Sequence, residues 1–130
     1  MGLGSSLIRA LIGKPLQLPE DIVARYPELS RVSYRRGGLP VRLAGWPLGQ
    51  SSAAAITLWQ TVFIASDTPI TAALLLHEFC HVTQFLRSRT FPVSYLWQSL
   101  RYGYHRNAYE VDANRYAAHR LAQSAVDKDL

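Results

Sequence analysis

Hydrophobic positions follow a helical period at the start of the chain. Leucine and isoleucine recur at helical spacing over residues 3–13, which predicts a short amphipathic helix that ends near Gly13 and Pro15. We expect this helix to pack on the domain and not to lie on a membrane surface. A second short helix is expected from Pro19 to Arg25, because Pro27 ends it.

The middle of the chain changes to a period of two. Val32–Tyr34 and Val41–Leu43 alternate on either side of Gly37 and Gly38, which predicts a hairpin. Two further runs of β-branched and aromatic residues predict strands, at residues 55–59 and 61–65. A loop is expected before them, around Gly45, Pro47 and Gly49. The first half therefore predicts a small, mostly antiparallel sheet of three or four strands.

The second half predicts helices. Asp67 or Thr68 before Pro69 makes a favourable helix start, and this helix is expected to reach about Arg87. Two further helices are expected, at about residues 93–102 and 107–126. Strands followed by helices indicate an α+β fold. The 130 residues predict one domain, with residues 1–18 as an N-terminal helical extension.

Composition narrows the class of protein. Hydrophobic residues make up 48% and charged residues 18%, which favours a packed core over disorder. The single cysteine, Cys80, excludes an intramolecular disulfide framework and a cysteine-rich zinc ribbon. Each apolar stretch is far shorter than the roughly 20 residues of a transmembrane helix. Because the N-terminus also lacks the features of a signal peptide, we expect a cytoplasmic protein.

The net charge of +5 favours anionic partners. The arginines cluster in one place, at Arg31, Arg35, Arg36 and Arg42. We interpret this group as a solvated face and expect no specific nucleic-acid partner. A basic nucleic-acid-binding domain is the less favoured alternative.

One motif carries chemistry: His77-Glu78-Phe79-Cys80-His81, inside the predicted long helix. Residues four apart lie about 40° apart around a helix, so both imidazoles can reach one metal ion. Glu78, about 100° from His77, would hold and deprotonate a metal-bound water. Zinc suits such a site. The alternative is two buried histidines with ordinary hydrogen bonds and a glutamate paired to an arginine.

A catalytic zinc needs a third protein ligand and keeps one position for water. A third histidine six residues after His81 is excluded, because Arg87 occupies that position. Several candidates near or on the last helix remain open, namely His105, Glu110, Asp112 and His119.

Two runs, LLHEFCHVTQ at residues 75–84 and YGYHRNAYEVDA at residues 102–113, resemble the gluzincin metallopeptidases. The nearest likeness is to their single-domain forms, the minigluzincins, and it spans roughly residues 31–120. The resemblance implies a zincin-like fold, hydrolysis of peptide or unfolded protein substrates, and one zinc ion per chain. It also implies roles for single residues: Glu78 as general base and acid, and His77, His81 and Glu110 as zinc ligands.

The chain departs from thermolysin-like gluzincins four residues after the ligand glutamate, where they have aspartate and this chain has Asn114. Asn114 shares the helix face of Glu110, so we expect it to support a zinc histidine. Asp112 lies about 200° around the helix and is expected to face solvent or an arginine. As a ligand it would instead indicate an aspzincin.

Other polar residues have open roles. Gln84 either lines the cleft or is a polar residue at the wet end of its helix. Cys80 is expected to be a small core residue, with a zinc-ligating thiolate as the alternative. Peptide hydrolysis also needs a donor to the developing oxyanion. The candidates, among which the sequence does not choose, are Tyr102, Tyr104, His105 and Tyr109.

Substrate binding in such folds uses the backbone of a sheet edge, and residues 61–65 are the expected edge strand. A rival hypothesis is a latent or catalytically weak zinc-binding module. In that case the N-terminal helix would cover the cleft and inhibit the site.

Overall fold

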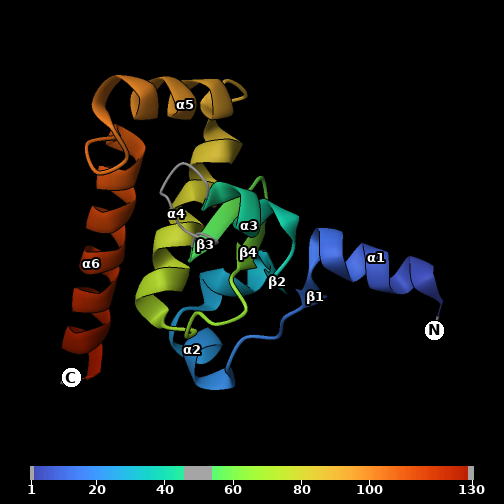
Figure 1. Ribbon diagram of the computed structural model, residues 1–130. Helices are drawn as coiled ribbons and strands as arrows, with labels where there is room; N and C mark the ends of the chain where they lie inside the picture. Colours follow the sequence, from blue (N-terminus) through green and yellow to red (C-terminus); the bar gives the residue numbers. More distant parts are fainter. Residues whose placement is uncertain (1, 46–53, 129–130) are drawn as a thin grey trace. The chain divides into compact units, whose positions relative to one another are not determined.

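The computed structural model describes residues 2–45 and 54–128 (Figure 1). The chain divides into two compact units. The sheet unit extends to Ile70 and carries every strand that the structure describes, and the helical unit begins at Thr71. The predicted α+β class is confirmed. The loop expected at Pro47 and Gly49 lies outside the described residues.

The sheet unit contains short helices and short strands in alternation. Its helices are α1 (Leu3–Ile12), α2 (Glu20–Arg25), the 3-10 helix η1 (Pro27–Arg31) and α3 (Leu39–Ala44). Its described strands are β1 (Lys14–Pro15), β2 (Ser33–Arg36), β3 (Ala55–Leu58) and β4 (Thr61–Ile64). The two predicted N-terminal helices and the strands predicted at 55–59 and 61–65 are therefore present.

The described sheet is mixed, with the strand order β1-β2-β4-β3. β2 pairs parallel with β4, so that Ser33 faces Thr61, and the other two pairings are antiparallel. This order corrects the expected substrate edge. β4 lies between two neighbours, and the edges of the described sheet are β1 and β3.

The hairpin predicted around Gly37 and Gly38 is wrong. Both glycines have positive φ, at 75° and 103°, and the chain leaves the sheet there. Pro40 then lies in the first turn of α3, a position that proline favours. Val41 is therefore helical and packs with Phe63 and Ala65 in a buried cluster.

Two of the clustered arginines bind the main chain of the sheet unit. Arg36 Nη1 donates to the carbonyl oxygens of Ala65 and Thr68. Arg35 donates to those of Ile12 and Gly13. These two side chains therefore hold turns and strand ends together.

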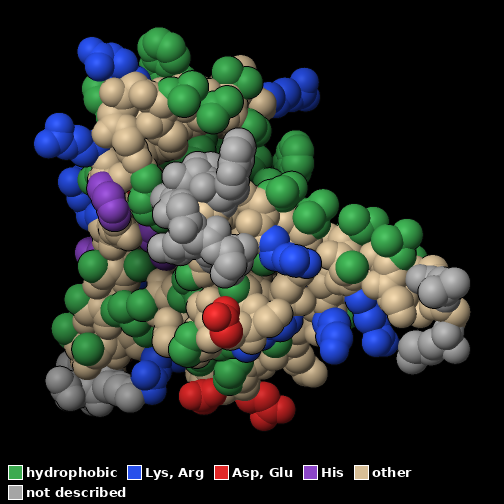
Figure 2. Space-filling model, in the orientation of Figure 1, with side chains coloured by type: hydrophobic (Ala, Val, Ile, Leu, Met, Phe, Trp, Pro, Cys, Tyr) green, Lys and Arg blue, Asp and Glu red, His purple; other side chains and the backbone are tan. Residues whose placement is uncertain are grey.

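The apolar face of α1 does not pack as expected. Leu7 and Ile8 are 61% and 54% exposed, and Leu11 and Ile12 are also exposed. Figure 2 shows hydrophobic side chains at the surface along α1. α1 contacts α3, but much of its apolar face stays exposed, so the expected packing of this helix on the domain is present only in part.

Gly13 joins α1 to β1 at a close backbone approach. Its φ is 71°, and a Cβ atom there would lie 2.5 Å from the carbonyl oxygen of Arg36. We predict that Gly13→Ala lowers the free energy of unfolding by about 2–3 kcal/mol, measured by urea denaturation. Gly37→Ala is the matched control, because its φ is 75° but its Cβ would meet a serine side chain. An equal loss in both variants would contradict the close approach.

The helical unit consists of α4 (Ala72–Arg87), α5 (Phe91–Tyr102) and α6 (Ala108–Lys128). α4 and α6 run side by side, and α5 connects them at one end (Figure 1). None of the helices in the described ranges is both long and apolar enough to cross a membrane.

The main difference between the predicted and the observed helix boundaries is the start of α4. α4 begins after Thr71, whose side chain accepts a hydrogen bond from Leu74 N at 3.2 Å. The predicted start at Asp67 or Thr68 is wrong because Thr68 N already bonds to the carbonyl of Ala65 in a turn. The expected start of the last helix is confirmed, since Asn107 Oδ1 accepts from Tyr109 N.

Candidate metal centre

Two helices of the helical unit bring the histidine motif and one glutamate together. α4 carries His77 and His81, and α6 carries Glu110 in its first turn. His77 Nε2 lies 3.0 Å from Glu110 Oε2, and His81 Nε2 lies 2.9 Å from Glu110 Oε1. A single carboxylate therefore bridges two imidazoles from successive turns of α4.

The three side chains are largely buried. His77, His81 and Glu110 expose 15%, 8% and 5% of their side chains. Burial opposes ionisation of Glu110, but hydrogen bonds from His77 and His81 outweigh it and hold the pKa of Glu110 well below its usual range. Burial alone would lower the pKa of His81, yet the hydrogen bond to Glu110 raises it overall. Both shifts favour the charged forms, the carboxylate of Glu110 and the protonated imidazole of His81.

This cluster could hold a metal ion. One nitrogen from each histidine and one oxygen of Glu110 all lie within 4.8 Å of one another. Imidazole nitrogen and carboxylate oxygen are ligands that a divalent transition metal such as zinc accepts. Of the other candidate ligands, His105, Asp112 and His119 are exposed and lie outside the cluster within the described ranges.

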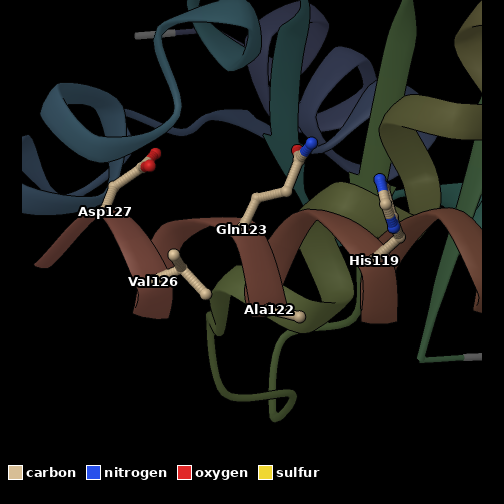
Figure 3. Close-up of a pocket in the computed structure, with 5 residues that line it drawn as sticks. All are labelled: His119, Ala122, Gln123, Val126 and Asp127. Atoms are coloured by element: carbon tan, nitrogen blue, oxygen red, sulfur yellow. The ribbon is translucent and has the colours of Figure 1, made fainter. Parts of the chain in front are cut away.

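His119 belongs to a different surface. It lines a shallow pocket of about 440 Å³ with residues one to two turns further along α6 (Figure 3). Asp127, the acidic residue of that pocket, follows His119 by eight positions, about 12 Å along the helix. These two side chains do not form a metal site together.

Gln84 fixes the orientation of His81. Its Oε1 lies 2.7 Å from His81 Nδ1, and its Nε2 donates to the carbonyl of Tyr109 at 3.1 Å. Because the amide oxygen accepts from Nδ1, the other ring nitrogen faces Glu110. Gln84 is buried, so it supports the site and does not lie at a wet helix end.

Asn114 does not take the role expected for it. It is exposed on α6, whereas Ala113 and Ala117 are buried. The buried face of α6 thus contains Glu110 and the small residues three and seven positions after it, Ala113 and Ala117. The supporting amide comes from Gln84 on α4 instead.

We predict that Gln84→Ala weakens zinc binding by about 10- to 100-fold, because His81 loses the partner that orients its ring. A competition titration against a chromophoric chelator measures this change. Asn114→Ala is the matched control, and its zinc affinity should stay within about twofold of wild type. Equal effects of the two substitutions would contradict the role of Gln84.

Tyr95 is a site residue that the sequence analysis missed. Its hydroxyl donates to Glu110 Oε1 at 2.8 Å, and its ring lies edge-on to His81 at 6.0 Å. Burial and the charge of Glu110 raise the pKa of Tyr95, so the hydroxyl keeps its proton. Asn107 holds this part of α5 through bonds to the carbonyl of Tyr95 and to Ser99. The sequence held one sign of this role: Tyr95 lies on the helix face opposite a stripe of apolar residues, which indicates that its side chain points inward.

The four candidates for the oxyanion donor differ in their surroundings. Burial and the charge of Glu110 raise the pKa of Tyr104, which is 42% exposed. His105 is exposed beside the Tyr104 ring, and Tyr102 is exposed beneath Arg101. Tyr109 packs its ring against Phe91.

Two remaining residues of the motif are buried. Glu78 is 6% exposed and adjoins His77 in the chain. Cys80 is a free, buried cysteine, and burial raises the pKa of its thiol, which disfavours a thiolate.

Comparisons of the chain with protein-family models, curated proteins and solved structures found no match. The functional inference therefore depends on the geometry and chemistry of this cluster.

Proposed function

We propose that this protein is a zinc-dependent metallopeptidase of gluzincin type with a zincin-like fold. One observation carries the proposal: a glutamate from a second helix lies within 3.0 Å of both motif histidines. Two ordinary buried histidines would not need a shared, ionised carboxylate from another helix. The three groups match the donor set of a catalytic zinc site.

His77, His81 and Glu110 would hold the zinc ion. A bound zinc ion supplies Lewis acidity toward a peptide carbonyl and lowers the pKa of water toward about 7. Three protein ligands leave room for water, which fits hydrolysis better than a purely structural site. Gln84 and Tyr95 orient His81 and Glu110 through hydrogen bonds of 2.7 and 2.8 Å.

Glu78 would move the proton. Its carboxylate accepts a proton from the attacking water and then passes that proton to the leaving amine. Tyr104 is the best placed of the oxyanion candidates, because the charge of Glu110 acts on its hydroxyl and its side chain remains partly exposed to an incoming substrate. His105 and Tyr109 lack that combination.

Metal removal tests the proposed activity. We expect the purified chain to cleave a mixture of unstructured peptides, followed by mass spectrometry. Treatment with 1,10-phenanthroline should abolish cleavage, and stoichiometric zinc should restore it while magnesium does not. Cleavage that survives chelation would contradict the proposal. A zinc-loaded chain without cleavage would favour the latent zinc-binding module.

A further inference from the structure

Helix α5 has two different faces. Phe91 and Tyr95 face the other helices, where their rings contact Tyr109 and His81. Four large apolar side chains occupy the opposite side and are 59–76% exposed, namely Val93, Leu96, Trp97 and Leu100. Their spacing places them within an arc of about 100°. We call these four residues the α5 stripe.

The surroundings of the α5 stripe are cationic. Residues 79–109 contain four arginines and no aspartate or glutamate. Arg87 and Arg89 precede α5, whereas Arg101 and Arg106 lie at its end and just beyond, and all four are exposed. In Figure 2 cationic side chains flank the hydrophobic ones at the end where α5 lies.

We propose that the α5 stripe binds an anionic lipid surface, with α5 lying in the plane of the membrane interface. An exposed apolar helix face framed by arginines is typical of interfacial binding. Tryptophan favours the headgroup region, and arginine pairs with lipid phosphates. A second copy of the chain is the poorer occupant, because pairing two stripes would bring like charges together.

This inference goes beyond the proposed function, and its test does not depend on hydrolysis. Tyr95, on the inner face of the same helix, binds Glu110. Membrane binding would therefore hold the candidate metal centre close to the lipid surface.

Sedimentation with lipid vesicles tests the inference on the full chain. We expect binding to vesicles of equal parts phosphatidylcholine and phosphatidylglycerol, and about tenfold weaker binding to phosphatidylcholine alone. The double variant Leu96→Ser/Trp97→Ser should lose at least about tenfold in binding to the anionic vesicles. Its circular dichroism and zinc content should match those of wild type, since both side chains are exposed.

The exposed apolar residues of α1 provide the matched control. Leu7→Ser/Leu11→Ser removes two exposed leucines from another amphipathic helix, whose one charged residue is Arg9. Because this helix lacks the set of arginines that frames the α5 stripe, its variant should keep vesicle binding within about twofold of wild type. The proposal is overturned if wild type does not bind the anionic vesicles, if Leu96→Ser/Trp97→Ser retains binding, or if the α1 variant loses at least as much binding as the α5 variant. Concentration-dependent dimerisation abolished by Leu96→Ser/Trp97→Ser would overturn it in favour of a second copy.

Discussion

Glu78→Gln should abolish peptide cleavage while leaving the zinc content unchanged. Glutamine has nearly the same shape as glutamate but cannot accept the proton of the attacking water. General acid–base groups contribute about 10²–10⁴-fold to rate, so we expect a fall of about 10³-fold in kcat/KM. Activity and zinc per chain should be measured on one preparation, because only their combination separates proton transfer from metal binding.

Glu20→Gln is the control for this substitution, since it removes the same charge from an exposed position of α2. It should leave cleavage unchanged. Cleavage retained by Glu78→Gln would contradict the role of Glu78. Loss of zinc from that variant would mean that Glu78 is needed to build the site.

Glu110→Ala should lose zinc and activity together. The substitution removes one of three protein ligands, and we expect zinc affinity to fall on the order of 10³-fold. Asp112→Ala is the matched control, because Asp112 lies two residues away on the same helix and is exposed. It should keep wild-type zinc. The reverse result would assign the third ligand to Asp112 and contradict the gluzincin arrangement.

The same substitution should change the acid stability of the zinc-free protein. The pKa of Glu110 is lowered in the folded state, so its contribution to stability is present above the unfolded value near 4.3. This contribution is lost as the pH falls toward the lowered pKa. Glu110→Ala should therefore be less stable at neutral pH, yet should lose less of its remaining stability on acidification. Thermal unfolding in the presence of a chelator, at pH 7 and pH 3, measures both effects.

Local periodicity predicted the helices well and the sheet only in part. The long apolar period of α4 and the cap at Asn107 are short-range signals, and the helix expected to reach Arg87 does so. The segment Val41-Arg42-Leu43 is too short to distinguish a strand from a helix turn. The neighbouring proline lies in the first turn of α3 and favours the helix. The parallel pairing of Ser33 with Thr61 joins distant segments, which no local pattern encodes.

The site residues also fall into two groups: those that local spacing predicts and those that depend on how the helices pack. His77, Glu78 and His81 follow from spacing within one helix, and the family resemblance pointed to Glu110. The choice between Gln84 and Asn114 depended on how α6 is rotated against α4. In the structure α6 buries Ala113 and Ala117 and leaves Asn114 exposed, and this rotation appears only once the helices pack. Tyr95 reaches Glu110 because α5 folds back beside the cluster, which the sequence pattern alone does not specify.

X-ray absorption at the zinc edge of the wild-type chain, loaded with one equivalent of zinc, tests the central claim most directly. We predict nitrogen and oxygen ligands at about 2.0–2.1 Å, with the outer scattering of two imidazoles. Failure to retain one zinc per chain would contradict a His77, His81 and Glu110 site. A sulfur ligand at about 2.3 Å would also contradict it and would place Cys80 on the metal.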